Sequence, residues 1–445
     1  MPEENVNVPE KRTLGFWDSV AIIVAIVVGV GIFKVPTEIA KYLNSPSLIF
    51  LAWFIGGLIA LSGALCYAEL SSSFPKTGGN YIYLKESYGP WAGFLFGWTE
   101  LLVIRTGSIA ALAFISAEYM LSFFCVTGFS IKVTAVLIIF VYSYLNIIGL
   151  RQSKAVLNVF TGVKILALIA MVVFGIMSKK GELSNFQSVI SPAGTAGFPL
   201  FGLALIPILW TYGGWHENTF MAGETKDAAK TIPRALFTGT LIVTALYLAI
   251  NALYIYLIPV NRIAGTDLVA SDALRILFGR PGQKALEILV IIATLGSINA
   301  TMMTGSRITY AMSKDSAIFK YLGGLDMKFG TPRRSIIING IWSAVLVVTG
   351  SFNELLFFTG IMVWVFFALV GGGLFILRHK FPETERPYKV WAYPVLPLIF
   401  IIVCIALSVN TLIFYPFQSW VGLALAMTGI PVYMISQKWV KERTI

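Results

Sequence analysis

The chain has 445 residues, of which 57% are hydrophobic and only 12% are charged. Because a soluble domain is typically about a quarter charged, this composition predicts a polytopic membrane protein and excludes a soluble enzyme, a nucleic-acid-binding protein and a secreted disulfide scaffold. The net charge of +11 is expected from cytoplasmic loops, and the 3 cysteines and 2 histidines predict neither a disulfide framework nor a metal site.

Twelve apolar stretches follow a polar N-terminal tail, 1–14, which does not have the pattern of a cleavable signal peptide. Each stretch is bounded by charges or by Gly, Pro and Asn, and one spanning helix needs about 20 residues. The expected spans are 16–40, 47–71, 91–124, 131–150, 155–177, 198–222, 235–260, 285–312, 335–351, 354–377, 391–415 and 418–437. The pattern predicts an all-α polytopic membrane protein of 12 transmembrane helices, with a short C-terminal tail, 439–445.

The loops between these stretches differ in charge from one side of the membrane to the other. An even number of spans places both termini on one side, and the loops on that side carry more than twice as many Lys and Arg as the others. Positive loops stay in the cytoplasm. We therefore expect a multi-pass protein of the plasma (inner) membrane, with both termini in the cytoplasm.

The first and sixth spans are interrupted by glycine, at Gly29-Val30-Gly31 and at Gly213-Gly214. Paired breaks five spans apart indicate an inverted repeat with broken helices around a site at the membrane midplane. The N-terminus of a half-helix attracts an anion such as a carboxylate, and its carbonyl end attracts a cation such as an ammonium. A zwitterion fits these two poles. The alternative is close packing of helices through small residues.

Several ionisable residues lie inside or at the ends of spans. Five residues correspond to about 140° of rotation in an α-helix, so Glu100 and Arg105 are expected to be poor partners that each meet another helix or a wet cavity. His216 and Glu217 follow the sixth-span break directly. A histidine there is expected to line a vestibule, with a titrating role as the alternative. Glu69 is expected to be interfacial.

Several motifs resemble a known family. They are Gly29-Val30-Gly31-Ile32-Phe33, Pro75-Lys76-Thr77-Gly78-Gly79-Asn80-Tyr81, Tyr212-Gly213-Gly214-Trp215, Ile232-Pro233-Arg234-Ala235 and Glu385-Arg386-Pro387-Tyr388. At these motifs the chain resembles the amino acid–polyamine–organocation superfamily, and within it a prokaryotic member of the L-type amino acid transporter family. The likeness runs from about residue 15 to about residue 415.

The resemblance implies a LeuT-like 5+5 inverted repeat with two extra C-terminal helices, in which helices 1 and 6 are broken. A single 12-helix transporter domain would cover residues 15–438. Its first repeat would span about 15–178, its second about 197–378 and the extra helices about 391–438.

The resemblance also implies the substrate site. The substrate carboxylate would be held by the backbone amides of Val30 and Gly31, with Ile26 and Val27 lining the site. The amine would be held by carbonyls of the sixth helix, at Trp210, Thr211 and Gly213, and Trp210 would be the outer gate. Val30 replaces the family's usual serine, His216 stands where many members have asparagine, and Val363 stands where some have asparagine before a matching Trp364.

Lys164 lies ten residues into the fifth span. A lysine at the centre of a spanning helix costs about 2.5–3.5 kcal/mol on insertion scales, so it should face the bundle and have partners. In sodium-independent relatives a fifth-helix lysine takes the place of a sodium ion, and Lys164 matches that motif. The expected partners are first-helix carbonyls or hydroxyls near Ser297 and Thr301. The alternative is a side chain that snorkels to the interface.

These observations predict a secondary transporter of neutral L-amino acids that works by alternating access, as a sodium-independent exchanger. A proton-coupled symporter of the same fold is the alternative. A channel or an intramembrane enzyme is a remote alternative, because the chain has no filter repeat and no nucleophile–base or His/Glu metal set. We expect no cofactor, no metal, no nucleic-acid partner and no enzyme activity.

The expected partners are a small amino acid substrate and the lipid bilayer. Mammalian L-type members pair with a single-span glycoprotein through an outer cysteine. Cys125 lies near the same junction between the third and fourth spans, but its neighbourhood is apolar. A stand-alone subunit without a heavy chain is therefore expected.

Overall fold

The computed structural model describes residues 12–126, 130–187, 197–266, 268–316, 319–349, 352–414 and 416–444. Over these ranges the chain is helical apart from short connections, and it contains no β-strand. An isolated parallel β-bridge joins Leu14 to Thr225. The all-α prediction is confirmed.

The helices of the first half cover the first five predicted spans. They are α1 (Phe16–Val27), α2 (Gly31–Tyr42), α3 (Pro46–Ser73), α4 (Asn80–Tyr88), α5 (Pro90–Thr99), the π-helical segment η1 (Glu100–Ile104), α6 (Arg105–Phe123), α7 (Ile131–Ile147), α8 (Leu150–Met177) and the 3-10 turn η2 (Leu183–Phe186).

The helices of the second half cover the other seven. They are α9 (Gly197–Thr211), the 3-10 helix η3 (Trp215–Glu224), α10 (Ala228–Leu257), α11 (Val260–Ile263), α12 (Val269–Phe278), α13 (Pro281–Asp315), η4 (Lys320–Gly323), α14 (Arg333–Thr349), α15 (Phe352–Lys380), α16 (Val395–Phe414), α17 (Pro416–Met427) and α18 (Gly429–Thr444).

Eight helices in the described ranges are long and apolar enough to cross a membrane, and nine when the bent pair α1 and α2 is counted as one span. The remaining predicted spans, the fourth, sixth and ninth, fall on α7, on α9 with η3, and on α14. α7 and α14 each have 17 residues, about 25 Å of helix. They are therefore short against a hydrocarbon core of about 30 Å.

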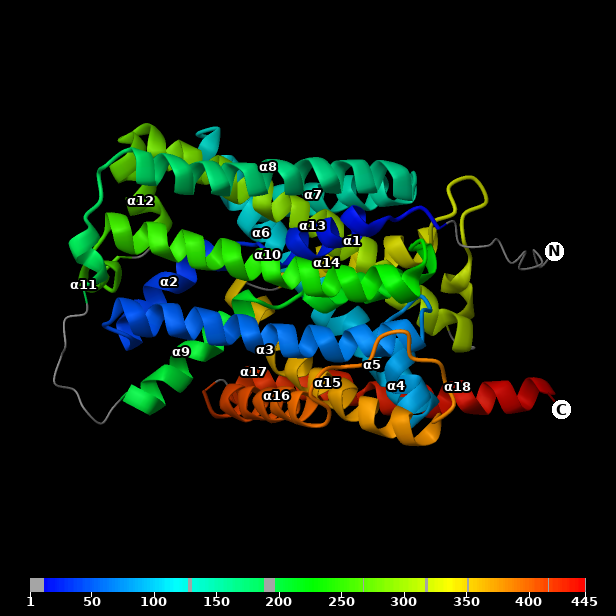
Figure 1. Cartoon of the computed structure of the whole chain (residues 1–445). Coiled ribbons are helices and arrows are strands. Elements are labelled where there is room, and N and C mark those ends of the chain that lie inside the picture. The colour runs from blue at the N-terminus through cyan, green and yellow to red at the C-terminus, as the bar shows by residue number, and fades with distance from the viewer. Residues whose placement is uncertain are drawn as a thin grey trace.

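The helices run side by side along one axis, with α8 on one side of the bundle and α16 on the opposite side (Figure 1). The apolar window of α13 is 78% buried, whereas those of α8 and α16 are only 28% and 22% buried. α13 is thus a central helix, and α8 and α16 present large apolar side chains such as Leu166 and Ile402 outward. In lipid this exposure carries no penalty.

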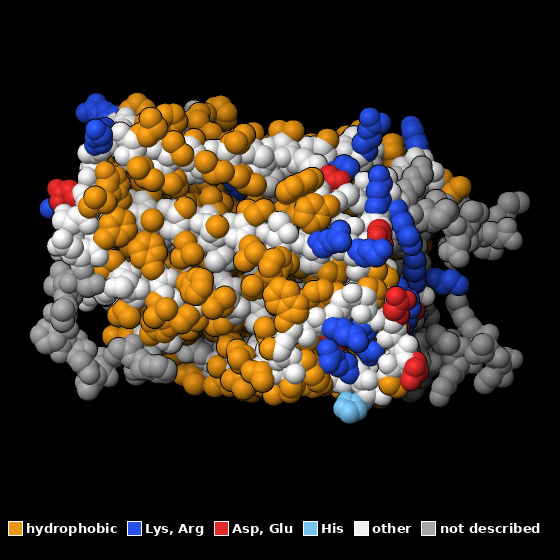
Figure 2. Space-filling view, viewed as in Figure 1, with side chains coloured by type: hydrophobic (Ala, Val, Ile, Leu, Met, Phe, Trp, Pro, Cys, Tyr) orange, Lys and Arg blue, Asp and Glu red, His pale blue; other side chains and the backbone are white. Residues whose placement is uncertain are grey.

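The two ends of the bundle differ in charge. α1 begins and α18 ends at the same end of the molecule (Figure 1). Lys and Arg side chains gather at that end, while hydrophobic side chains cover the middle (Figure 2). This separation is the one that the loop charges predicted, so the end with the termini is the candidate cytoplasmic end.

The packed body extends into the predicted tails. Leu14, in the predicted N-terminal tail, is fully buried. Its carbonyl accepts a hydrogen bond from the Lys226 amide at 2.9 Å. α18 continues to Thr444, through most of the predicted C-terminal tail. Residues 1–11 and 445 lie outside the described residues.

Both predicted breaks are present. α1 and α2 are bent by 49° where the helix is interrupted at Val28–Val30. α9 ends at Thr211, and the chain continues through Gly214, whose φ of 107° is left-handed, into the 3-10 helix η3. Glycine adopts such a φ at low cost. The prediction that helices 1 and 6 are broken is confirmed.

Glu69, which was expected to be interfacial, lies near the end of α3 and is a buried, ion-paired residue. Glu69 is 1% exposed and accepts two hydrogen bonds from the Arg378 guanidinium, at 2.8 and 2.6 Å. The Val390 amide donates to the same carboxylate at 2.7 Å. The chain after α15 folds back over the end of α3, which the local sequence around Glu69 does not reveal. The bonds fix this end of α3 to α15.

Candidate functional site

A cavity of about 200 Å³ lies between the two helix breaks. All seven predicted site residues line it: Ile26, Val27, Val30, Gly31, Trp210, Thr211 and Gly213. Binding pockets for drug-sized ligands are usually about 300–1,000 Å³, so this cavity suits a smaller molecule. The structure brings together residues that lie up to 187 positions apart in the chain.

The first wall of the cavity is the start of α2. The amides of Val30 and Gly31 have no backbone acceptor within the described residues, and no side chain caps this helix. Unpaired amides at a helix N-terminus attract an anion. A β-carbon on Gly31 would lie 2.7 Å from the Thr211 methyl carbon. Glycine at this position therefore lets the two broken helices touch.

The opposite wall is the end of α9. The last carbonyls of a helix have no intrahelical donor, and here the Trp210 carbonyl receives the Gly213 amide at 3.0 Å. Gly214 then turns the chain away, and a β-carbon there would lie 2.5 Å from Ile26. The carbonyl end of α9 thus faces the amide end of α2 across one small cavity.

Tyr247 of α10 links the two breaks, and the sequence did not reveal it. Its hydroxyl contacts the carbonyl oxygens of Val27, at 2.8 Å, and of Thr211, at 3.2 Å. The side chain is fully buried and packs on Trp53 and Tyr212. A tyrosine inside an apolar span carries no local mark of such a role, because its partners belong to two other spans.

Lys164 is fully buried in α8. Its ammonium donates to the carbonyl oxygens of Ala25, at 3.0 Å, and Val28, at 2.6 Å, where α1 ends. The Ser297 hydroxyl of α13 donates to the same Ala25 oxygen at 2.7 Å. Lys164 therefore does not snorkel to the interface. It joins the fifth span to the unwound end of the first, beside the eighth.

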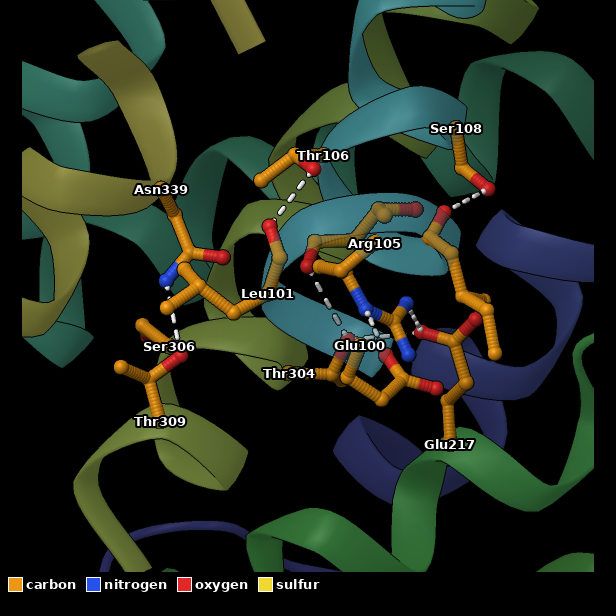
Figure 3. A network of polar contacts seen from close by, with 12 residues as sticks. Glu100, Leu101, Arg105, Thr106, Ser108, Glu217, Thr304, Ser306, Thr309 and Asn339 are labelled. Atoms are coloured by element: carbon orange, nitrogen blue, oxygen red, sulfur yellow. Dashed lines mark hydrogen bonds and ion pairs between the residues drawn. The ribbon is translucent and has the colours of Figure 1, made fainter. Parts of the chain in front are cut away.

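The expectation that Glu100 and Arg105 are poor partners was wrong. Arg105 Nε donates to Glu100 Oε2 at 3.1 Å. The reason is that residues 100–104 form a π-helical segment, in which the Arg105 amide bonds the Glu100 carbonyl. This i to i+5 spacing places residues five apart on one face. The expectation of a partner on another helix was correct, because Arg105 Nη1 also donates to Glu217 (Figure 3).

Glu217 completes a network that faces the cavity. Its Oε2 accepts from Arg105 at 2.5 Å and from the Thr304 hydroxyl of α13 at 2.7 Å. Glu100, Arg105 and Glu217 all line the cavity and are at least nine-tenths buried. Figure 3 shows the three side chains converging from η1, α6 and η3.

The cavity is also lined by Val363 and His216, where the sequence departs from the family it resembles, and by the matching Trp364. Val363 and Trp364 contribute apolar surface. His216 is 6% exposed, and its ring packs on Phe367 with centroids 4.6 Å apart. Its Nδ1 and the Oδ1 of Asn80 are buried without a partner in the described part of the chain. The site therefore mixes apolar walls with a few polar atoms.

The amino acid permease family model matches residues 14–435, which is nearly the whole chain and contains both breaks. The chain belongs to the amino acid permease family. The LeuT-like fold, with its first and sixth helices broken, follows from this membership and from the helices described above. Members of this family are permeases, not enzymes.

Named relatives of this permease cover most of its length. It is 29% identical over 447 residues to the human "Large neutral amino acids transporter small subunit 2", covering 96% of this chain and 81% of that protein. It is 28% identical to the "Serine/threonine exchanger SteT" of Bacillus subtilis (strain 168), covering 95% and 96%. It is 28% identical to the human "Cystine/glutamate transporter", covering 99% and 88%. The chain is thus an L-type amino acid transporter relative.

The end of η3 is fixed to α13 and to the start of the described chain. Arg307 of α13 holds Glu224 at the end of η3 with bonds of 2.9–3.3 Å, and Leu14 is bridged to Thr225. Trp210, at the other side of the cavity, is 39% exposed. The side chain of the predicted gate is therefore only partly covered by protein. Its role as a gate stays a prediction.

No group of three or more His, Cys, Asp or Glu side chains that could hold a metal occurs in the part of the permease that the structure describes. The charged lining residues are those of the Arg105 network. Arg105 and Glu217 are 112 positions apart, so only a spatial contact could reveal their pairing. The roles of the seven predicted lining residues and of Lys164 remain predictions.

Proposed function

We propose that this permease exchanges neutral L-amino acids across the plasma membrane by alternating access, without sodium. The supporting observation is the pair of breaks around one cavity. Free amides at the start of α2 suit an α-carboxylate, and the carbonyl end of α9 suits an α-ammonium. The lining residues Val30, Gly31, Trp210, Thr211 and Gly213 would hold the substrate, with Ile26 and Val27 beside it.

The balance of buried charge supports a neutral side chain. Among the lining residues, the Arg105 guanidinium is bonded by the carboxylates of both Glu100 and Glu217. Burying an unpaired charge is costly. Because these charged side chains are bonded to one another, the cavity offers no unpaired charged group to a cationic or anionic side chain of the substrate. The breaks themselves would satisfy both ends of a zwitterion.

Lys164 supports sodium independence. Its ammonium lies on two carbonyl oxygens of the first-span break, and carbonyl oxygens are also what a bound sodium ion would use. A fixed ammonium at that place would bind the carbonyl oxygens that a sodium ion would otherwise bind. We propose that it holds α8 against the end of α1 while the rest of the bundle moves.

Uptake into proteoliposomes tests this function. Radiolabelled alanine, serine and leucine should enter vesicles that are preloaded with unlabelled amino acid, at the same rate in sodium and in choline buffer. Empty vesicles should take up little. Faster uptake of arginine or glutamate than of all three neutral amino acids, or strict dependence on sodium, would contradict the proposal.

A proton-coupled symporter is a second candidate, because ionisable side chains line the cavity. Glu100, Glu217 and His216 are all buried there, and such residues can relay protons. The two candidates separate in empty vesicles under an inward proton gradient. A symporter accumulates alanine under those conditions, and an exchanger does not.

We also propose a single polypeptide that acts without a heavy chain, with both termini in the cytoplasm. The cationic end that holds the termini supports the orientation (Figure 2). Cys125 is exposed and lies 3.8 Å from the Lys284 ammonium, so its surroundings do not themselves prevent a disulfide. Gel electrophoresis of native membranes with and without reductant would reveal a disulfide-linked partner, whose presence would overturn this part of the proposal.

A further inference from the structure

The Arg105 guanidinium is the positive group that lines the cavity, and its position is fixed by close packing. A β-carbon on Gly305 of α13 would lie 2.3 Å from the Arg105 stem, so glycine leaves room for the side chain. The guanidinium carbon lies 5.6 Å from the centre of the Phe220 ring. Arg105 is 3% exposed. It is therefore held beside the substrate space rather than free to swing away.

Two carboxylates bind this guanidinium from different directions. Glu100 belongs to the π-helical turn that directly precedes Arg105 in the same continuous helix. Glu217 comes from η3, three residues after the glycine turn of the sixth span. A guanidinium that is bonded by carboxylates has few donors left for another carboxylate.

We propose that Glu217 is a specificity-determining residue, which makes the cavity reject amino acids with an acidic side chain by neutralising Arg105. This inference rests on the proposed transport of amino acids and names which of them are refused. Without Glu217, Arg105 Nη1 would lose its carboxylate partner, and Glu100 would be the one carboxylate of the network left on the guanidinium. An acidic side chain of the substrate could then take the place of Glu217.

The Thr304 contact explains why the carboxylate points at Arg105. The Thr304 hydroxyl donates to the same Oε2 that accepts from Arg105. Two donors on one oxygen fix the rotamer of Glu217 (Figure 3). The carboxylate is therefore held on the guanidinium and is not available to pair with a cationic substrate.

The test is a charge series in proteoliposomes made with the full-length protein. Uptake of labelled glutamate, lysine and alanine is compared in wild type, Glu217→Gln, Arg105→Gln and the double variant. Glu217→Gln should raise the ratio of glutamate to alanine uptake at least about tenfold, the factor of one charge-assisted hydrogen bond. Arg105→Gln should instead raise the ratio of lysine to alanine. The double variant should return to the wild-type ratios.

Glu287→Gln is the matched control. Glu287 is also a buried carboxylate, 4% exposed, and it accepts from the Ser122 hydroxyl at 2.8 Å, but it does not line the cavity. This variant should keep the wild-type ratios. Glu217→Asp should keep them as well, because it retains the charge. A merely structural network would lower the uptake of all three amino acids together.

The outcomes separate this inference from the proposed function. If wild type transports no amino acid, the proposed function fails and the inference fails with it. If wild type transports alanine and neither single variant changes its ratio, only the inference is overturned. If Glu217→Gln is not folded, Arg105→Gln decides alone: a raised ratio of lysine to alanine supports the inference and an unchanged ratio overturns it.

Discussion

Gly31 shows how one residue determines the geometry of the site. It is the first residue of α2, and its φ is not left-handed, so freedom of the backbone does not explain it. The explanation is contact, because any β-carbon would meet the Thr211 side chain at 2.7–3.2 Å. The close approach of the two breaks depends on the absence of that atom.

We expect Gly31→Val to abolish transport while the protein still inserts and folds. The branched side chain would push Thr211 away and fill the space in front of the free amides. Gly31→Ala should give a partial loss. Uptake normalised to the amount of protein in the membrane is the measurement. Gly162→Val is the control, since nothing lies within 4 Å of a β-carbon there. Wild-type affinity in Gly31→Val would refute the assignment of the site.

Tyr247→Phe should reduce transport about two- to tenfold without unfolding the protein. The hydroxyl contacts carbonyl oxygens of both breaks, and the net value of a hydrogen bond is about 0.5–1.5 kcal/mol. Tyr254→Phe, seven residues further along α10, is the matched control. Its buried hydroxyl has no partner within the described residues, so uptake should be unchanged or slightly raised. Equal losses in both variants would argue against a role of Tyr247 in the site.

The limit of sequence reasoning is visible at the same scale. Local patterns located the breaks at Gly31 and Gly213, because a glycine inside an apolar stretch stands out from its neighbours, whereas Thr211 was implied by the family resemblance alone. Tyr247 and Glu217 were not assigned to the site, since a tyrosine in a span and a glutamate after a break are ordinary locally. Their importance comes from partners on other spans, which one sequence does not specify.

At the scale of elements, the third span shows where the regular geometry of an α-helix gave a wrong prediction. The 100° per residue of an α-helix separates Glu100 from Arg105, but the π-helical turn brings them together. The hydrophobic pattern of 91–124 is the same with or without that turn. The apolar stretches were therefore located correctly, while the irregular turn that aligns two charges was not predicted.

The 3-10 helix η3 is the element that we expect to close the cavity toward the candidate cytoplasmic end. Its last residue, Glu224, is buried and bonded by Arg307 of α13. Leu14 lies against the same turn through its bridge to Thr225. Removing one partner of a buried ion pair costs about 3–5 kcal/mol. That cost is large enough to favour a conformation in which η3 leaves α13.

Arg307→Ala should therefore open the cytoplasmic side. In a background without Cys66, Cys125 and Cys404, a cysteine at Thr225 should be protected from a membrane-impermeant maleimide applied to inside-out vesicles, because Thr225 is fully buried. Arg307→Ala should make it reactive and slow transport. Lys230→Ala is the control, since Lys230 forms only an exposed pair with Asp227 at 3.9 Å. Continued protection in Arg307→Ala would show that this pair is not part of the inner closure.

At the scale of the whole molecule, the distribution of charge predicts an orientation. The end with the termini carries the concentration of Lys and Arg (Figure 2). An epitope tag at either terminus should be accessible to antibody in inside-out vesicles and protected in right-side-out vesicles. A tag at Gly265, in the connection between α11 and α12 at the other end, should give the opposite result. Both tags on one side would contradict the predicted topology.

Lys164 connects local contacts to the behaviour of the whole transporter. Its ammonium joins α8 to the end of α1, and Ser297 of α13 shares the Ala25 carbonyl. Three helices thus meet at one charged group. Without it, the Val28 carbonyl oxygen would lose this donor, and the Ala25 oxygen would keep the Ser297 hydroxyl. The loss of such a buried hydrogen bond costs about 1–3 kcal/mol. This cost is enough to shift a conformational equilibrium about five- to 150-fold.

We therefore expect Lys164→Ala to lower the rate of exchange strongly, with little loss of expression, and wild-type exchange to ignore sodium. Lys180→Ala is the matched control, because Lys180 also donates to two carbonyl oxygens, at 3.0 and 2.9 Å, but at the far end of α8. The Lys180→Ala variant should take up amino acids at the wild-type rate. A pH jump then separates a structural role of Lys164 from proton transfer by its amine. With a structural role, exchange does not depend on the proton gradient, whereas with proton transfer the gradient drives accumulation of the amino acid. Full activity of Lys164→Ala, or uptake that requires sodium, would exclude both roles for this lysine.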